Sequence, residues 1–455
     1  MTTKYLCFDR LLLQSGWLAP AYVGVDAAGI IQYLQTHPPS EAVAIEFVPG
    51  FALPGFQNAH SHAFQYAMAG QAERHAAGAK DDFWSWREAM YRCALGIDPE
   101  QLEGIAAMLY AAMLRQGYTH VAEFHYLHHD KEGKPYDNLA EMGERLIAAA
   151  ETAGIKITLI PVFYQRGGFA REALPQQRRF LSRTTDDYLQ LLDDSASAVR
   201  HSILANLGFS VHSLRAVDQN DIIKTFRDGP PSIPFHLHAA EQKKEVADCL
   251  AILKQRPVAW ILDHLPVTDR FNLVHCTHLD DVEVKSLAAS GAHVVLCPGT
   301  EGNLGDGIFR LSDYTVHGGA WCIGTDSHIS LSPIEDLRWL DYTQRLVTHK
   351  RNTFDDGAAR LISSAVINGR CAMGLPSSGY FEVGTPLDAV VFDAHAPLLM
   401  QAEEQNILSA ILYTSSSAEI FGTLVNGKWC VKNLHHVRQG AITLQFLNAV
   451  RPGKG

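Results

Sequence analysis

The sequence predicts an α/β protein whose main part is a (β/α)8 TIM-like barrel, joined to a small β-sandwich built from both chain termini. Three observations lead to this prediction. Eight short apolar runs rich in β-forming residues recur along the chain. Segments in which apolar residues have helical spacing separate these runs. The two ends of the chain instead carry short strand-like runs with turns between them.

The eight apolar runs are expected to be parallel strands. Nearly continuous apolar strands that alternate with helices are typical of a parallel sheet covered on both faces, and eight such units close into a barrel. In chain order the runs are residues 51–56, 119–126, 156–164, 203–212, 233–238, 271–275, 293–297 and 321–324. The clearest helical segments between them are residues 99–115, 139–153, 242–254 and 280–289.

The terminal strand-like runs are expected to pair in space, with the barrel inserted between them. They are residues 4–13, 22–33, 388–393 and 420–431. We therefore expect residues 1–50 and 385–455 to form one composite β-sandwich domain, and residues 51–384 to form the catalytic barrel. The 455 residues are enough for a barrel with an accessory domain of this size.

Composition and charge restrict the partners. The net charge of −11 argues against nucleic acid or an anionic membrane as the main partner, because both favour a basic surface. No apolar run approaches the roughly 20 residues that a membrane span needs. Residues 1–9 lack the pattern of a signal peptide. The eight cysteines are scattered without a Cys-x-x-Cys pair, as in reduced thiols of a cytoplasmic protein, which is the localisation we expect.

Reactive side chains follow the ends of four predicted strands. Because the active site of such a barrel lies at the carboxyl ends of its strands, these groups are expected to share one rim. They are His60 and His62 after the first run, His238 and Glu241 at the fifth, His275 at the sixth and Asp326 after the eighth. A metal-dependent hydrolase needs imidazoles that hold the metal ion and a nearby glutamate that transfers protons.

Two details of this set can be argued from position. His60 and His62 are two residues apart, so on a strand their side chains face the same way. His236 is expected to face away from the site that His238 joins. Either His275 or His278 could face the metal, and His275 is preferred because it lies at the end of its strand while His278 begins the following loop.

These motifs resemble those of the amidohydrolase superfamily, from the segment 53–62 to the segment 386–393. The His-x-x-Glu of the fifth run and the Gly-Thr-Asp-Ser after the eighth are similar to the mononuclear aminohydrolase branch, which deaminates amidines and purine or pyrimidine rings. The segments 62–65, 83–88, 123–129 and 210–215 resemble those of branch members that act on a linear amidine. This likeness implies a barrel of the amidohydrolase type and hydrolytic release of ammonia from a small anionic amidine.

The resemblance also implies roles for individual residues. Metal ligands would be His60, His62, His238 and Asp326; catalytic groups would be Glu241, His275 and Asp326; substrate contacts would be Gln65, Arg87, Tyr126, His212 and Arg215. The run 203–212 offers no lysine at its end, where two-metal relatives carry a carbamylated lysine, so one metal ion is expected. Three imidazoles and a carboxylate suit zinc. By resemblance the protein is expected to be a homodimer.

Two other functions fit parts of this pattern. A ring aminohydrolase, such as a guanine-type deaminase, would share the metal ligands and differ in its pocket. Arg87 and Arg215 favour a substrate with two carboxylates, because arginine binds carboxylates with two hydrogen bonds, whereas a purine pocket needs stacking aromatics and amides. A non-catalytic barrel that serves as a scaffold is the third possibility, but the chain retains all four predicted ligand residues together with Glu241 and His275.

Overall fold

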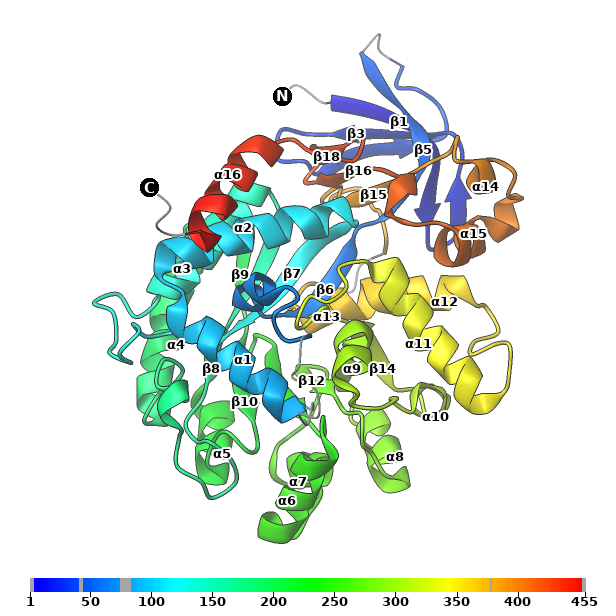
Figure 1. Cartoon of the computed structure of the whole chain (residues 1–455). Helices are drawn as coiled ribbons and strands as arrows, with labels where there is room; N and C mark the ends of the chain where they lie inside the picture. The colour runs from blue at the N-terminus through cyan, green and yellow to red at the C-terminus, as the bar shows by residue number, and fades with distance from the viewer. Residues whose placement is uncertain (1–3, 41–43, 74–82, 377–378, 452–455) are drawn as a thin grey trace.

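The computed structural model describes residues 4–40, 44–73, 83–376 and 379–451. These residues form two sheets with helices around them (Figure 1), one of which is the predicted barrel. Within these ranges, no helix combines the length and apolar character needed to cross a membrane.

Eight strands, all paired in parallel, form the barrel in the order β6-β7-β8-β10-β11-β12-β13-β14. Their bounds are β6 Phe56–Ser61, β7 Tyr118–His125, β8 Lys156–Phe163, β10 Phe209–Ser213, β11 Phe235–Ala239, β12 Phe271–His275, β13 His293–Leu296 and β14 Ala320–Ile323. A short additional strand, β9 (Ala205–Leu207), pairs with β8. The predicted (β/α)8 architecture is confirmed.

The barrel is closed by contacts between β6 and the segment that follows β14. Ser61 and Asp326 form a parallel bridge. The backbone N–H groups of Thr325 and Asp326 both donate to the carbonyl of His60 at 3.0 Å. The side-chain amide of Asn58 donates to the Thr325 hydroxyl at 2.8 Å. The closure thus occurs at the level of two predicted metal ligands.

Helices cover the outside of the barrel (Figure 1). The main ones are α1 Phe83–Gly96, α2 Pro99–Arg115, α3 Glu141–Ala153, α4 Thr185–Val199, α5 Gln219–Asp228, α6 Lys243–Leu253, α7 Pro257–His264, α8 Asp281–Ala289 and α11 Pro333–Thr348. Shorter ones are α9 Pro298–Leu304, α10 Leu311–Val316, α12 Ala358–Ser363 and α13 Gly369–Ala372. Two further short helices, α14 Pro397–Met400 and α15 Ile407–Thr414, lie beside the other sheet (Figure 1). The predicted helices agree closely with these bounds. At α2 and α8, the side chains of Asp98 and Asp280 accept hydrogen bonds from backbone N–H groups of the first turn and so mark where each helix begins.

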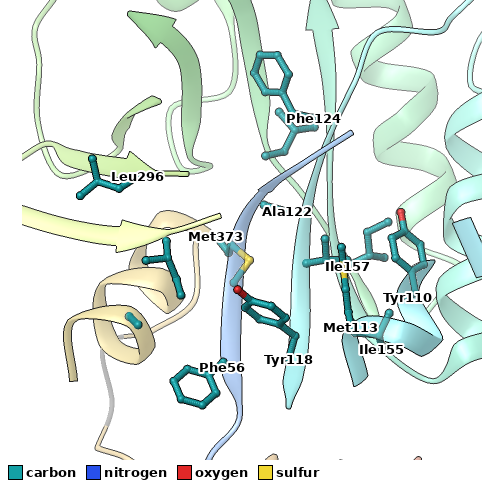
Figure 2. Packing of buried hydrophobic residues seen from close by; sticks show 14 of the residues in the cluster. Phe56, Tyr110, Met113, Tyr118, Ala122, Phe124, Ile155, Ile157, Leu296 and Met373 are labelled. Carbon is teal, nitrogen blue, oxygen red and sulfur yellow. The ribbon is translucent and has the colours of Figure 1, made fainter. Parts of the chain in front are cut away.

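The core between barrel and helices is continuous and apolar. All residues of β7 are buried. Figure 2 shows buried side chains of β6, β7 and α2, among them Phe56, Tyr118, Phe124 and Met113, each fully buried. Burying an apolar side chain of this size stabilises the fold by about 1.5–3 kcal/mol. This packing makes the strand ends a rigid base for the site.

Strands from both termini form the second sheet, as predicted. Its order is β18-β17-β16-β15-β5-β1-β3-β4, with β2 paired to β1. The bounds are β1 Lys4–Leu13, β2 Gly16–Leu18, β3 Ala21–Val25, β4 Ile31–Gln35, β5 Ile45–Pro54, β15 Ala389–Asp393, β16 Ile420–Val425, β17 Lys428–Lys432 and β18 His435–His436. The expected two-sheet β-sandwich is therefore corrected in one respect: these strands are hydrogen-bonded as one continuous mixed sheet. The last helix, α16 (Gln439–Val450), returns to pack on α2 (Figure 1).

Two predicted runs are divided differently in the structure. The run 51–56 contains the end of β5, which belongs to the terminal sheet, and the first residue of β6, with only Gly55 between them. The run 203–212 is split into β9 and β10 by Gly208. In both cases two strands follow each other with a single intervening residue, so the apolar pattern does not reveal the break.

Candidate metal centre and active site

Three imidazoles and one carboxylate meet at the carboxyl end of the barrel. His60 lies in β6, His62 directly follows it, His238 lies in β11 and Asp326 follows β14. All four residues are buried. One possible ligand atom from each lies within 4.8 Å of the others. The four residues predicted to be ligands are thus brought together from three strand ends.

Hydrogen bonds fix which nitrogen of two histidines faces the centre. Nδ1 of His62 donates to the Phe124 carbonyl at 2.7 Å, and Nδ1 of His238 donates to the His212 carbonyl at 2.9 Å. Because a carbonyl oxygen can only accept, each Nδ1 carries the proton and each Nε2 presents a lone pair. His60 Nε2 lies 3.2 Å from His62 Nε2 and 3.1 Å from His238 Nε2. At least two of these three converging nitrogens present lone pairs, an arrangement suited to bind a cation.

The donor set fits a zinc ion. His62 Nε2 lies 3.1 Å from Asp326 Oδ1. Ligands at about 2.0–2.1 Å from a tetrahedral zinc are roughly 3.3–3.4 Å apart, close to the separations seen here. Burial and the neighbouring imidazoles hold the pKa of His60 and His238 well below the usual value. Burial alone would raise the pKa of Asp326, but the neighbouring imidazoles lower it. The donors are therefore in the forms that bind metal.

Glu241 and His275 lie beside these ligands. His275 Nε2 is 3.8 Å from Glu241 Oε1 and 3.8 Å from Asp326 Oδ2. Burial favours the neutral ring, but the carboxylates of Glu241, Glu301 and Asp326 outweigh it and raise the pKa of His275 to about 10. The ring is thereby held as a hydrogen-bond donor toward the centre. His278, the other candidate on this segment, is less buried and lies in the loop after β12.

Glu301 holds His275 from behind. Its Oε1 accepts from the Cys297 N–H at 2.9 Å and lies 3.2 Å from His275 Nδ1. This contact directs Nε2 of His275 toward Glu241. Glu301 is not among the predicted site residues, because it lies inside helix α9 (Pro298–Leu304) and not at the end of a predicted strand. Leu304, at the end of this helix, lines the pocket.

A pocket of about 520 Å³ opens next to the metal ligands. All five predicted substrate contacts line it: Gln65, Arg87, Tyr126, His212 and Arg215. They come from different elements, since Gln65 lies in the 3-10 helix η1 (Ala63–Met68) and Arg87 lies in α1. The Gln65 amide donates to the Tyr126 hydroxyl at 3.0 Å. Glu241, His275 and Asp326 line the same pocket, so the predicted catalytic groups and substrate contacts share one cavity.

Arg215 is paired with two carboxylates. Its guanidinium lies 3.4 Å from Glu241 Oε2 and 3.3 Å from Glu245 Oε2. Glu245 also accepts from the backbone N–H of Glu241 at 3.1 Å. These charges raise the pKa of Arg215 although burial opposes this, so the cation persists in the pocket wall. Glu245 was not predicted, although its place four residues after Glu241 on α6 was a usable signal.

Two tyrosines of the pocket were also missed. Tyr91 lies in α1 and Tyr164 directly follows β8, and both line the pocket. Tyr164 closes the predicted run 156–164, so its place at a strand end could have identified it. Tyr91 lies on a helix outside the barrel, where no local pattern marks it as part of a site.

A barrel that carries three imidazoles, two carboxylates and a further histidine at its strand ends defines a metal-dependent hydrolase. The chain belongs to the amidohydrolase family, whose model matches residues 51–430. It is similar to a formimidoylglutamate deiminase of Pseudomonas aeruginosa, with 42% identity over 451 residues, 97% of this chain and 98% of the relative. A 5-methylthioadenosine/S-adenosylhomocysteine deaminase of Pelotomaculum thermopropionicum is 23% identical over 394 residues, 83% and 79% of the two chains.

Solved structures agree with this family. The chain is similar to an amidohydrolase of Brucella melitensis, with a TM-score of 0.92, 39% identity and coverage of 98% of this chain and 99% of that one. An adenosine deaminase of Xanthomonas campestris with bound zinc matches with a TM-score of 0.80 at 21% identity, over 99% and 98% of the two chains. The latter likeness concerns the fold alone.

Proposed function

We propose that this protein hydrolyses N-formimino-L-glutamate to N-formyl-L-glutamate and ammonia. The observation that carries the proposal is the pocket itself, in which the guanidinium groups of Arg87 and Arg215 share one cavity with Glu241 and three metal ligands. A substrate with two carboxylates and a compact amidine needs both kinds of group, because arginine pairs with carboxylates. The 42% identity to a formimidoylglutamate deiminase over nearly the whole chain supports the same reaction.

The side chains divide the work as follows. His60, His62, His238 and Asp326 would hold the metal, which when it is zinc supplies a water whose pKa falls from about 15.7 to about 7. Glu241 takes the proton of the attacking water, and Asp326 assists this first transfer. His275 donates a hydrogen bond to the oxygen of the tetrahedral intermediate. Glu241 then passes its proton to the departing nitrogen, which receives the hydroxyl proton as well when the C=O bond forms and the C–N bond breaks, and it leaves as ammonia.

The substrate contacts hold the rest of the molecule. Arg87 and Arg215 each bind one carboxylate, while Gln65, Tyr126 and His212 supply neutral hydrogen-bonding groups. Glu245 keeps Arg215 in place through its ion pair. The alternative of a ring deaminase is less supported, since the ring deaminase of Pelotomaculum thermopropionicum shares only 23% identity.

We further propose that zinc is the native metal, that the enzyme is a cytoplasmic homodimer, and that the reaction belongs to histidine degradation. The nitrogen-rich ligand set supports zinc. The eight scattered cysteines support a reducing compartment. Metal analysis of protein purified without added metal tests the first point, and analytical ultracentrifugation tests the homodimer.

The decisive experiment is ammonia release by zinc-loaded protein supplied with N-formimino-L-glutamate, with the product identified by mass spectrometry. Ammonia together with N-formyl-L-glutamate supports the proposed reaction. Formamide together with free glutamate would show that the other C–N bond breaks, and the proposed reaction would then be wrong. Absence of turnover with N-formimino-L-glutamate, combined with turnover of a purine, would favour the ring deaminase instead.

A further inference from the structure

Gln177 lies behind the pocket and contacts two tyrosines that line it. It ends the 3-10 helix η2 (Pro175–Gln177) and is fully buried. Its Oε1 accepts from the backbone N–H of Leu174 at 2.7 Å. Because a backbone N–H can only donate, this bond settles which end of the amide is oxygen. The Nε2 group therefore donates to the hydroxyls of Tyr91 at 2.9 Å and Tyr164 at 2.7 Å.

This orientation determines what the two hydroxyls can do next. Both tyrosine oxygens accept a hydrogen from Gln177, so each hydroxyl proton must be directed elsewhere. Since both tyrosines are buried and line the pocket, they present an O–H donor to its interior.

Arg87 lies close to these hydroxyls. Its guanidinium carbon is 5.5 Å from the centre of the Tyr91 ring. Burial raises the pKa of Tyr164, although the charges of Arg87 and Arg215 oppose this. Arg215 is instead in contact with Glu241, at 3.4 Å. The two hydroxyls and the Arg87 guanidinium thus lie in one part of the pocket wall.

We propose that Tyr91 and Tyr164, oriented by Gln177, form with Arg87 a subsite that binds one carboxylate of the substrate. This inference rests on the proposed function, because it specifies how the anionic part of that substrate is recognised. A carboxylate only accepts hydrogen bonds, so it satisfies every group of the subsite. A carboxamide of the same shape would turn an N–H₂ group toward donors and leave them unpaired, which a site of this kind rejects strongly.

The first test compares three variants on three substrates. The variants are Tyr91→Phe, Tyr164→Phe and the control Tyr314→Phe, which removes a buried hydroxyl bonded to the Ala292 carbonyl outside the pocket. The substrates are N-formimino-L-glutamate and two analogues that each lack one carboxylate, N-formimino-4-aminobutyrate and N-formimino-L-norvaline. All assays use the zinc-loaded full chain, and kcat and KM are determined separately.

We expect Tyr164→Phe to raise KM for N-formimino-L-glutamate about 10- to 100-fold, the loss typical of a hydrogen bond to a charged group, with kcat nearly unchanged. Tyr91→Phe should act in the same direction. The analogue that lacks the carboxylate bound here should be insensitive to both variants, and the other analogue should respond as the full substrate does. Tyr314→Phe should change neither constant. Equal effects of Tyr164→Phe on all three substrates would overturn the subsite.

Gln177→Glu tests the orientation itself. The new carboxylate has nearly the same shape and still accepts from the Leu174 N–H, but it accepts from the tyrosine hydroxyls instead of donating to them. Both hydroxyl protons then turn away from the pocket, so KM should rise at least as much as in Tyr164→Phe. An unchanged KM in a folded Gln177→Glu variant would contradict the role of Gln177.

A binding measurement separates this inference from the proposed reaction. Titration calorimetry of N-formyl-L-glutamate into zinc-loaded protein reports carboxylate recognition without turnover. Weaker binding to Tyr164→Phe than to the unmodified protein supports the subsite even when the amidine is not hydrolysed, in which case only the proposed reaction fails. Equal binding to both proteins, together with normal turnover, would refute the subsite and leave the proposed reaction standing.

Discussion

The hydrogen-bond partner of Nδ1 determines whether Nε2 of the same histidine ring presents a lone pair or a proton. In His62 and His238, Nδ1 donates to a backbone carbonyl, so Nε2 faces the other ligands as a lone pair. In His275, Nδ1 instead faces the carboxylate of Glu301, and the ring is held as a donor. We therefore propose that the same residue type serves as ligand or as catalytic group according to the partner of its Nδ1.

Substitution of Glu241 is expected to lower kcat strongly. Glu241→Gln keeps the shape of the side chain but cannot take a proton, so we expect a 10²- to 10⁴-fold lower kcat, the usual worth of a proton shuttle. Zinc content should stay near that of the unmodified protein, because Glu241 is outside the ligand set. Steady-state kinetics with metal analysis checks this. Normal turnover would show that another group moves the proton.

Glu301 should act through His275. Glu301→Gln retains an oxygen for the Cys297 N–H but removes the charge that holds the His275 ring, so kcat should fall about 10²-fold with KM little changed. The matched control is Glu283→Gln, since Glu283 is also buried and also accepts a backbone N–H, at 3.1 Å from Ala259, but on α8. If both variants lost activity equally, the effect would come from a buried charge in general.

At the scale of elements, the junction between β6 and the segment that follows β14 has two structural roles. It closes the barrel through the bonds from Thr325 and Asp326 to the His60 carbonyl, and it sets the distance between two metal ligands. Barrel closure and metal geometry are therefore coupled at this seam. The backbone of Asp326 has a φ of 47°, which shows that the chain turns sharply to bring the carboxylate inward.

Gly324 is the tightest point of this seam. A Cβ at this position would lie 2.7 Å from the His60 Cβ and 2.8 Å from the His60 nitrogen, so the strands would have to separate. Gly324→Ala should therefore lower the zinc affinity and the free energy of unfolding, the latter by about 1–3 kcal/mol as for other overpacked sites. Gly302→Ala is the control, because a Cβ there meets nothing within 4 Å. Zinc titration and urea unfolding measure both effects.

On the scale of the whole molecule, one strand connection joins the two sheets. β5 pairs with β1 and β15 in the terminal sheet, and after Gly55 the chain continues as β6 in the barrel. The first metal-binding strand is thus anchored by strands from both termini. Loss of either terminal segment is expected to disturb the position of His60 and His62 through this connection.

The metal should stabilise the entire fold, because its ligands come from β6, β11 and the end of β14. Removal by a chelator should abolish activity and lower the midpoint of thermal unfolding. An ion present at 100 times its Kd stabilises the folded state by about 2.7 kcal/mol. Adding zinc back should restore both properties. His60→Asn provides the control, since its unfolding should hardly respond to chelator or zinc; a response equal to that of the unmodified protein would argue against this ligand set.

Acid should unfold the protein through buried neutral histidines. Burial lowers the pKa of His120 and of His125 to about 3 each, below the value of about 6.5 in an unfolded chain. Below about pH 6.5 the unfolded state therefore binds protons that the folded state does not, and stability falls as the pH drops toward 3. Each histidine contributes about 1.4 kcal/mol per pH unit to this slope.

Urea unfolding between about pH 7 and about pH 5 measures the slope. His125→Gln should make the pH dependence shallower by the contribution of one histidine. Because His125 lies outside the pocket, this change should leave kcat intact. A slope unchanged in His125→Gln would show that this ring is protonated in the folded state as well.

The sequence by itself determined the barrel and the positions of the metal-facing residues. Both follow from local patterns: apolar runs of strand length alternate with helical segments, and reactive side chains stand where those runs end. Glu241 was found because it lies one turn beyond a strand-end histidine. Each of these residues can be located from the strand that it ends or follows, without knowledge of the other strands.

Only the tertiary structure shows which side chains contact and orient the site residues from outside the pocket. Glu301 contacts His275 from helix α9, which follows a different barrel strand. Gln177 donates hydrogen bonds to Tyr91 of α1 and to Tyr164 after β8. The tertiary structure also decided that the terminal strands form one sheet and that β5 ends where β6 begins. These contacts join residues far apart in sequence, and a local pattern records what a segment prefers but not which segment it meets.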